Sequence, residues 1–467
     1  MVFSSLIFIF IFLPITLAIY YISPRKFRNF VLLCASLVFY GWGEPVYIVI
    51  MVFSTIFDYM NGLFISKYRK NKPICNAIFL NSVVINLGIL FFFKYYGFLI
   101  DNINSILGLN INFHSLPLPV GISFYTFQTL SYVIDVYLGK VKAQKNIISF
   151  GAYVTMFPQL VAGPIVRYSD VNKELDNRKE TFDNFGCGVE RFITGLGKKV
   201  LLANNIGLLW TSIKASNISE ISVFTSWIGI LAFTFQIYFD FSGYSDMAIG
   251  LGKMFGFNFI ENFNYPYVSK SITEFWRRWH ISLGSWFREY VYIPLGGNRN
   301  GLRNQCRNLL VVWFLTGLWH GASWNFIFWG LYFGFFILIE KLFLLKYLEK
   351  NKVVAHIYTM ILVILGWVFF DLDTLTNAFT YIKTMFGLNG AKFIDSASIY
   401  YLKNNIFLFI ILGITSTPII SNIIEKLKED MNGKVMNMLI LANIFIMLIS
   451  IAFLVNESYN PFLYFRF

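Results

Sequence analysis

Long apolar runs separated by short polar segments fill the chain from end to end. The first run covers residues 3–22. Later runs, with soft boundaries, lie near residues 30–42, 46–65, 76–93, 118–137, 148–166, 192–213, 221–239, 308–319, 324–345, 354–371, 400–420 and 436–455. A helix that spans a bilayer needs about 20 mostly apolar residues. The pattern therefore predicts a polytopic membrane protein with roughly ten crossings.

Glycine and proline interrupt or bound several of these runs. Pro158 and Pro164 lie in one of them, and Gly317 and Gly321 mark the end of another. At membrane depth, irregular backbone is tolerated only where it is buried in protein or lines a watery cavity. We therefore predict an all-α fold in which roughly 10–12 transmembrane helices, with re-entrant and interfacial amphipathic helices, surround a central tunnel.

Residues 257–307 depart from the apolar pattern. They carry seven basic and three acidic residues, interleaved with Phe, Trp and Tyr. Such a segment is too polar to span a bilayer and is typical of amphipathic helices that lie in the membrane interface. No internal repeat or low-complexity linker divides the chain. We therefore expect one integral membrane domain over residues 1–455, followed by a short tail over residues 456–467.

The composition fits a membrane protein and excludes other classes. Hydrophobic residues make up 57% of the 467 residues and charged residues only 13%, whereas soluble domains are about 25% charged. This difference excludes a soluble enzyme and a nucleic-acid-binding module. The four cysteines form no CxxC pair, so no metal site is predicted.

The distribution of basic residues predicts the orientation in the membrane. The net charge of +13 arises from 38 basic and 25 acidic residues. Basic clusters lie at residues 67–72, 140–145, 167–180 and 425–434. Such clusters mark the cytosolic side of a membrane protein. We therefore expect the C-terminal tail outside the cell and, because no basic residue precedes Arg25, the N-terminus outside as well.

Two histidines are the clearest candidates for chemistry, because ionisable residues within membrane segments are costly and usually functional. His320 lies in TGLWHGASW between two apolar runs, where the neighbouring glycines allow helices or a substrate to approach closely. His280 lies in FWRRWHISLGSWFREY, where an interfacial anchoring role is an equal alternative. We expect His114 and His356, which no pattern supports, to be structural.

Three other segments carry polar groups. QIYFDFSGYSDMAIG places Asp240 and Asp246 six residues apart, which is poor spacing for one helical face. A polar network along the tunnel is therefore favoured over paired acid–base catalysis. The loop YIPLGGNRNGLRNQCRN combines glycines and arginines, as phosphate-binding loops do, although cytosolic basic charge explains it equally well. On composition alone, the tail SYNPFLYFRF is typical of an aromatic anchor at the interface.

The longest motifs resemble those of the membrane-bound O-acyltransferases (MBOAT). The resemblance rests on FWRRWHISLGSWFREYVYIPLGGNR (residues 275–299) and LTGLWHGASWNFIFWGLYFG (residues 315–334). FYGWGEP, PVGISFYTFQTLSYVIDVY, FPQLVAGPIVRY and QIYFDFSGYSDMAIGLGKMFGF are similar to the alginate O-acetyltransferase-like branch, which includes peptidoglycan and cellulose acetylation. The resemblance implies the MBOAT fold. It also implies that His320 is the histidine of a membrane-embedded catalytic centre and His280 the second histidine of the bacterial branch.

The tail has a resemblance of its own. FLYFRF is similar to the FLYxxF end of a small partner peptide in teichoic-acid D-alanylation, whose tyrosine is implicated as an acyl relay. This resemblance implies that Tyr464 carries an acyl group. The pKa of a phenol, about 10, is close to that of a thiol, about 8.5. A tyrosyl ester therefore keeps much of the transfer potential of a thioester.

The resemblance implies that the chain moves an acetyl group from cytosolic acetyl-CoA across a bacterial plasma membrane, for O-acetylation of an extracellular polysaccharide. His320 is expected to act as general base on the Tyr464 hydroxyl or to relay its proton, and His280 to orient the thioester or to donate a hydrogen bond to it. The arginines expected near the donor phosphates are Arg277, Arg278, Arg288 and Arg299. The implied partners are the lipid bilayer, acetyl-CoA, a polysaccharide acceptor and an extracellular SGNH-type or similar transferase, with no metal and no nucleic acid.

Three alternatives compete with this hypothesis. In the first, the acceptor itself enters the tunnel and no acyl-tyrosine forms. In the second, the chain is a D-alanyl transferase that uses a loaded carrier protein as donor. In the third, it is a polysaccharide-export subunit without chemistry of its own. The motifs do not distinguish among acceptor polymers or between acetyl and other acyl groups.

Overall fold

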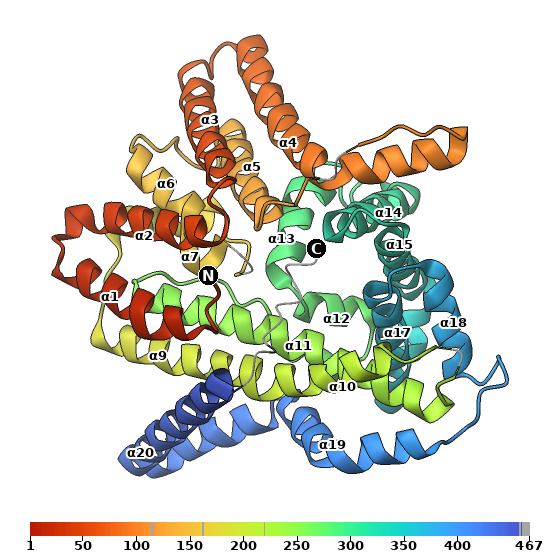
Figure 1. Ribbon diagram of the computed structural model, residues 1–467. Coiled ribbons are helices and arrows are strands. Elements are labelled where there is room, and N and C mark those ends of the chain that lie inside the picture. Colours follow the sequence, from red (N-terminus) through yellow and green to blue (C-terminus); the bar gives the residue numbers. More distant parts are fainter. Residues whose placement is uncertain (114–115, 161–162, 219, 457–458, 460–467) are drawn as a thin grey trace. The chain divides into compact units, whose positions relative to one another are not determined.

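The computed structural model describes residues 1–113, 116–160, 163–218, 220–456 and 459, with residues 428–434 described by their backbone alone (Figure 1). Over these residues the chain is helical and contains no β-strand. The all-α prediction is therefore confirmed.

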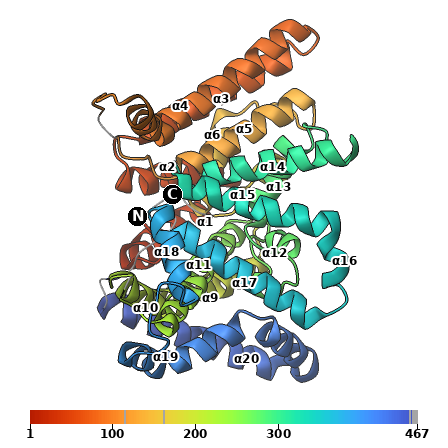
Figure 2. The same ribbon diagram turned by 90° about the vertical axis from the view of Figure 1, so that its right-hand side faces the viewer.

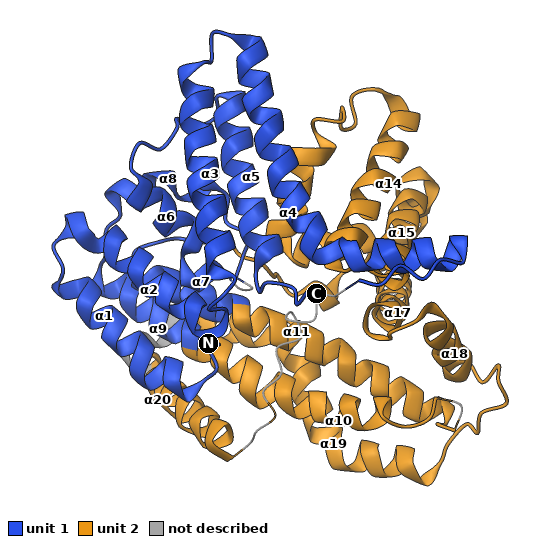
Figure 3. Cartoon of the chain, turned by 45° about the horizontal axis from the view of Figure 1, so that its top comes forward, with its two compact units in different colours: residues 1–192, 245–260 blue, residues 193–244, 261–467 orange. Residues whose placement is uncertain are grey.

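The chain forms two compact units (Figure 3). Unit 1 comprises Met1–Phe192 and Ser245–Ile260, and unit 2 comprises Ile193–Tyr244 and Glu261–Phe467. Two of the three dividing points fall inside the helices α9 (Phe182–Gly197) and α11 (Val223–Met254), and the third follows Ile260, in the segment after α11. At the first two points the chain passes between the units within a continuous helix. The expectation of one integral domain over residues 1–455 stays a prediction.

Unit 1 is built from short and long helices around an aromatic core. Before α9 they are η1 (Phe8–Phe12), α1 (Leu13–Ile22), η2 (Arg25–Phe27), α2 (Arg28–Gly43), α3 (Ile48–Lys67), α4 (Lys72–Leu107), α5 (Ile122–Leu138), α6 (Ile147–Thr155), α7 (Phe157–Leu160) and α8 (Tyr168–Asn177). Phe8 packs edge-on against Phe39 and Phe157, with ring centroids 5.8 and 6.1 Å apart. The apolar run 148–166 folds as α6 and α7 rather than as one helix, because Pro158 cannot continue α6.

A buried ionic cluster holds the loop between α8 and α9 in unit 1. The Glu180 carboxylate accepts a hydrogen bond from the Tyr20 hydroxyl at 2.7 Å and pairs with Arg28 at 2.7 Å and Arg178 at 3.5 Å. Burial alone raises the pKa of Glu180. The hydrogen bonds from Tyr20 and Arg28 and the charge of Arg28 outweigh it, so this pKa lies below its usual value. The cluster is a structural anchor in which two arginines share one carboxylate.

Unit 2 carries the remaining helices. Besides part of α9 and most of α11 they are η3 (Lys198–Asn204), α10 (Asn205–Lys214), η4 (Pro266–Val268), α12 (Ile272–Arg278), α13 (Ile281–Phe287), η5 (Arg288–Tyr292), α14 (Gly301–His320), α15 (Trp324–Ile339), η6 (Glu340–Leu344), α16 (Leu345–Leu348), α17 (Lys352–Asp371), α18 (Leu375–Met385), α19 (Ser396–Thr415) and α20 (Ile419–Asn456). Helices α14, α15 and α17 lie side by side (Figure 2). At the α14–α15 crossing, a methyl group on Gly317 would overlap the Phe326 carbonyl oxygen, so glycine allows the two backbones to touch.

Seven helices of the described chain are long and apolar enough to cross a membrane, which supports a multi-pass membrane protein. They are Ile48–Lys67, Lys72–Leu107, Val223–Met254, Trp324–Leu348, Lys352–Asp371, Ser396–Thr415 and Val435–Asn456. A shorter apolar helix covers Phe8–Ile22. The larger number predicted from the sequence counted broken runs, such as 148–166, that form shorter helices.

Candidate active site

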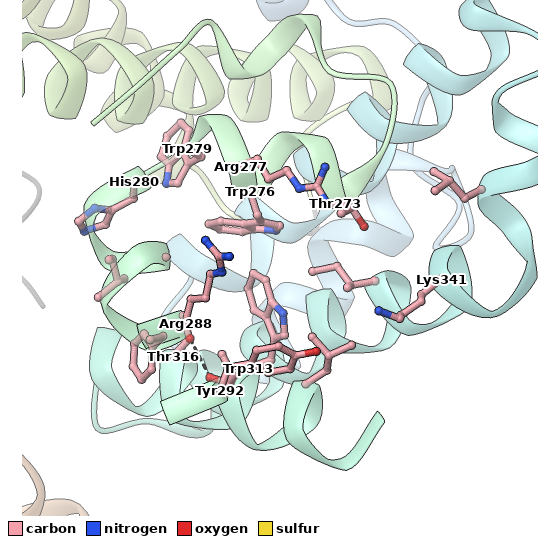
Figure 4. Close-up of a pocket in the computed structure, with 17 residues that line it drawn as sticks. Thr273, Trp276, Arg277, Trp279, His280, Arg288, Tyr292, Trp313, Thr316 and Lys341 are labelled. Atoms are coloured by element: carbon pink, nitrogen blue, oxygen red, sulfur yellow. Dashed lines mark hydrogen bonds between the residues drawn. The ribbon is translucent and has the colours of Figure 1, made fainter. Parts of the chain in front are cut away.

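A cavity of about 450 Å³ within unit 2 is the centre of the candidate site (Figure 4). Its lining comes from α12, α13, η5, α14 and the continuous segment α15–η6–α16. Its aromatic lining residues are Trp276, Trp279, Phe287, Tyr292 and Trp313. A cavity of this size with largely apolar walls suits a small-molecule ligand.

Three basic side chains reach this cavity from three elements. They are Arg277 of α12, Arg288 of η5 and Lys341 of η6, and no Asp or Glu is among the described lining residues. This imbalance favours a ligand that carries negative charge. Arg288 and Lys341 both lie in π-helical turns, a feature frequent at functional sites. Lys341 was missed by the sequence reasoning because no motif surrounds it.

His280 lines the cavity between α12 and α13, and Figure 4 places it at the opposite end of the labelled residues from Lys341. Its side chain is buried, and its φ of 45° is in the left-handed region that few non-glycine residues adopt. Such strained backbone is concentrated at functional sites. Burial lowers the pKa of His280 to about 3, so the ring is neutral near pH 7. These features favour a role in chemistry over the alternative of an interfacial anchor.

Buried polar groups hold the His280 ring in place. The Asn262 side-chain oxygen lies 3.1 Å from His280 Nδ1, and it also accepts hydrogen bonds from Ser282 N at 3.2 Å and Ser282 Oγ at 2.8 Å. The Phe241 ring packs edge-on against the imidazole at a centroid distance of 4.7 Å. Asn262 and Ser282 were not predicted, because their motif gives no sign that they meet the histidine.

His320 is the last residue of α14 and lies among aromatic rings. Its ring is 4.8 Å from that of Trp329 and 5.0 Å from that of Trp319, measured between centroids. His320 is not among the described residues that line the cavity. Trp319 also packs against His280 at 5.9 Å. The two histidines predicted from the sequence therefore share one tryptophan, but only His280 lines the cavity.

A buried glutamate fixes α12, the helix that carries Trp276 and Arg277 of the cavity lining. The Glu340 carboxylate accepts hydrogen bonds from the backbone N–H groups of Ile272 and Thr273, at 2.6 and 2.8 Å, and from the Thr273 hydroxyl at 2.7 Å. These are the unpaired donors at the start of α12, where a negative charge is favourable. Glu340 was missed by the sequence reasoning, although an acid inside the apolar run 324–345 was a signal for it.

Arg278 and Arg299 are not among the described residues that line the cavity. Arg278 pairs with Glu274 at 2.9 Å and donates to the Asn264 carbonyl at 3.1 Å. Arg299 is exposed in the loop after η5. Tyr464 and His114 lie outside the described residues. The structure thus brings His280 together with two of the four predicted arginines, and it separates Arg278 and Arg299 from them.

The other polar residues considered in the sequence, Asp240, Asp246 and His356, have partners of their own. Asp240 forms an ion pair with Lys199 at 2.5 Å, and both side chains are 2% exposed. Asp246, in unit 1, pairs with Arg191 at 2.6 Å. Neither aspartate is among the described lining residues of the cavity. His356 Nδ1 lies 3.0 Å from the Ser269 carbonyl, in keeping with the structural role expected for it.

Comparison with known proteins gives consistent matches. The family model of MBOAT, the membrane-bound O-acyltransferase family, matches residues 140–370. The chain is 40% identical to the probable alginate O-acetylase AlgI of Pseudomonas putida over 100% of both chains. It is 34% identical to the peptidoglycan O-acetyltransferase of Helicobacter pylori, over 84% of this chain and 81% of that protein. It is 27% identical to the teichoic acid D-alanyltransferase of Bacillus subtilis, over 55% of this chain and 70% of that protein.

Proposed function

Since the chain belongs to the membrane-bound O-acyltransferase family, we propose that it transfers an acetyl group from cytosolic acetyl-CoA for O-acetylation of an extracellular polysaccharide. Family membership makes it a multi-pass membrane O-acyltransferase. Two of the relatives reported above are named for the O-acetylation of alginate and of peptidoglycan. Their names support a glycan polymer as the final acceptor. The termini are proposed to face the outside of a bacterial plasma membrane.

The cavity is the observation that carries this proposal. Its basic side chains, Arg277, Arg288 and Lys341, match the phosphates of coenzyme A, and its aromatic walls match the thin, uncharged pantetheine arm. His280 lies at the end far from Lys341, where the thioester is proposed to lie (Figure 4). Of the arginines predicted from the sequence, the proposal keeps Arg277 and Arg288 for the donor.

The transfer itself is proposed to pass through Tyr464. The phenol oxygen attacks the thioester carbonyl, a carbon–oxygen bond forms and the carbon–sulfur bond breaks. The phenol proton passes to a histidine acting as general base and then to the departing sulfur, so coenzyme A leaves as the thiol. On the outside, a sugar hydroxyl attacks the tyrosyl ester and the phenol is restored. An SGNH-type or similar transferase is proposed to catalyse that second step.

Both histidines are proposed to serve this reaction. His280 is the one that lines the cavity and therefore the one placed to meet the donor. His320 packs against the same Trp319 and is proposed to relay the proton of the acceptor hydroxyl to His280. On this view, replacing either histidine stops transfer, whereas only His280 replacement disturbs the donor end.

Intact-mass spectrometry of the purified chain after incubation with acetyl-CoA tests the proposal. We expect an acetyl adduct on the wild type that maps to Tyr464 and is lost in Tyr464→Phe and His320→Ala. Acetyl transfer to a glycan without any adduct would support direct transfer instead. An adduct that forms only with a D-alanyl carrier protein would support the D-alanyl alternative, to which the Bacillus subtilis relative lends weight. Unchanged transfer by His320→Ala and His280→Ala would support a subunit without chemistry.

A further inference from the structure

Asn262 makes contacts that decide where the ring proton of His280 lies. It is fully buried in unit 2, in the segment between α11 and η4. Its side-chain oxygen is within hydrogen-bond distance of three groups, two of them on Ser282 and the third on His280. An amide carries an oxygen that only accepts and a nitrogen that only donates. The neighbours of the side chain therefore fix which way it faces.

The backbone of Ser282 fixes that orientation. A backbone N–H can only donate, and Ser282 N lies 3.2 Å from the side-chain oxygen of Asn262. If the amide were turned over, two donors would face each other at this distance. The atom that faces His280 Nδ1 at 3.1 Å is therefore the acceptor oxygen.

The Ser282 hydroxyl also faces His280 Nδ1 as an acceptor. It has one hydrogen, which it donates to Asn262 Oδ1 at 2.8 Å. Its oxygen also lies 3.3 Å from His280 Nδ1, and because its hydrogen is already used it faces that nitrogen as an acceptor. Both neighbours of Nδ1 thus require a proton on Nδ1.

We infer that Asn262 is a positioning residue that holds the ring proton of His280 on Nδ1 and makes Nε2 the proton-accepting atom of the acyl transfer. The second half of this statement rests on the proposed function, and the first half does not. In a neutral imidazole one nitrogen donates and the other accepts, and the hydrogen bond made by one nitrogen sets the state of the other.

This assignment argues against one of the roles expected for His280, the donation of a hydrogen bond to the thioester. A histidine that polarises a thioester needs a ring N–H directed at the carbonyl oxygen. The N–H of His280 is directed at Asn262 instead. The lone pair on Nε2 suits a general base. Burial, which keeps the ring neutral near pH 7, preserves that lone pair.

The chain offers a sharp test because it has only four histidines. The full chain is labelled with [¹⁵N]histidine, and the imidazole nitrogens are observed by NMR at pH 7, where bare and protonated nitrogens differ strongly in chemical shift. Loss of signals in His280→Gln assigns the ring. We expect Nδ1 protonated and Nε2 bare in the wild type. A protonated Nε2 and bare Nδ1 overturns the inference without any variant and without reference to activity.

Three variants sharpen the result. Asn262→Leu, of similar size, removes the acceptor and releases the Ser282 hydroxyl to donate to Nδ1, so the ring proton should move to Nε2. Asn262→Asp keeps an acceptor, so the proton should stay on Nδ1. Ser282→Ala leaves both the Asn262 oxygen and the backbone N–H that orients it, so the proton should also stay. A proton that stays on Nδ1 in Asn262→Leu contradicts the positioning role.

His356 is the internal control. Its Nδ1 lies 3.0 Å from the Ser269 carbonyl, which can only accept, so its ring also carries the proton on Nδ1. Its signals should be identical in all three variants. If they change in a variant, that variant has disturbed the fold, and the wild-type spectrum then decides the question.

Kinetics report on the second half of the inference. We expect Asn262→Leu to lower kcat about 100-fold, the smaller end of what a general base contributes, with the KM for acetyl-CoA unchanged and with activity restored in part by Asn262→Asp. If the ring proton moves to Nε2 in Asn262→Leu but kcat stays unchanged, the role of His280 as a base is excluded. The assignment of the wild-type tautomer would still hold. If wild type shows no acyl transfer at all, the proposed function fails, and the NMR result still stands by itself.

Discussion

Two groups of basic side chains, one in each unit, show that the same residue types can stabilise the fold or bind a ligand. In unit 1, Arg28 and Arg178 meet the carboxylate of Glu180. In unit 2, Arg277 and Arg288 line a cavity with no acid among its described lining residues. Arginines that share a carboxylate stabilise the fold, whereas a cavity lined by one sign of charge prefers a ligand of the other sign. The presence or absence of an acid, not the basic residues themselves, distinguishes anchor from binding site.

The largest effect is expected from breaking the anchor. Glu180→Ala leaves two buried guanidiniums without their carboxylate, which costs about 3–5 kcal/mol for a buried pair. We expect a marked fall in the unfolding temperature of the purified protein. Asp176→Asn, at an exposed position of the same segment, is the control and should change stability by less than about 0.5 kcal/mol. Equal stability of the two variants would mean that the cluster is no anchor.

The second effect tests the cavity's unmatched charge. Arg277→Gln and Arg288→Gln each remove a charged donor for a phosphate, worth about 1.5–3 kcal/mol. We expect the KM for acetyl-CoA to rise about 10- to 100-fold with little change in unfolding temperature. Arg278→Gln is a matched control, because this neighbouring arginine is paired with Glu274. If Arg278→Gln raises the KM as much as Arg277→Gln, the cavity is not the donor site.

The third effect separates two adjacent residues of opposite charge. Glu340→Gln weakens the hydrogen bonds at the start of α12 and should destabilise the protein by about 1–3 kcal/mol, because the buried donors lose a charged acceptor. Lys341→Gln should instead raise the KM for acetyl-CoA and leave the unfolding temperature almost unchanged. Thermal unfolding and steady-state kinetics of both variants provide the measurement. The reverse pattern would contradict the roles assigned here.

The smallest expected effect is on how the free energy of unfolding depends on pH. Because burial lowers the pKa of His280 to about 3 from 6.5, the unfolded chain binds a proton that the folded chain excludes. This contribution to stability is complete above about pH 6.5 and is lost as the pH falls toward 3. Between pH 7 and pH 5 the wild type should lose on the order of 1–2 kcal/mol more than His280→Gln. Parallel unfolding curves for the two proteins at both pH values would refute the shift.

The sequence predicted the parts of the molecule that depend on local pattern. Apolar runs of helical length yielded the all-α membrane fold, and the histidine and arginines of one short motif, His280, Arg277 and Arg288, do meet at a cavity. Residues that act across a fold escaped prediction. Asn262 lies 18 positions before His280, and Glu340 lies 68 positions after Ile272, so packing alone brings them together.

The separation of adjacent arginines shows a second limit. Arg277 and Arg278 look alike in the sequence, but neighbours on a helix point about 100° apart. One reaches the cavity, and the other reaches Glu274, one turn back along its own helix. Only the rotation of α12, which Glu340 helps to fix, decides which arginine does which. His320 is a similar case, because the glycines around it predict close packing but not which residues line the cavity.

The two π-helical turns around the cavity make this site sensitive to chain length as well as to side chains. A π turn holds one more residue than an α turn, and in η6 the Leu345 N–H therefore reaches back five positions to the Glu340 carbonyl. Deleting a single residue there would remove the extra residue and let the turn close as an ordinary α turn, with the residues on either side kept on nearly the same helix faces. The same holds for η5, which carries Arg288. Insertion or deletion of one residue in these turns can therefore change how Arg288 and Lys341 are presented to the donor site, while the helices on either side keep their faces.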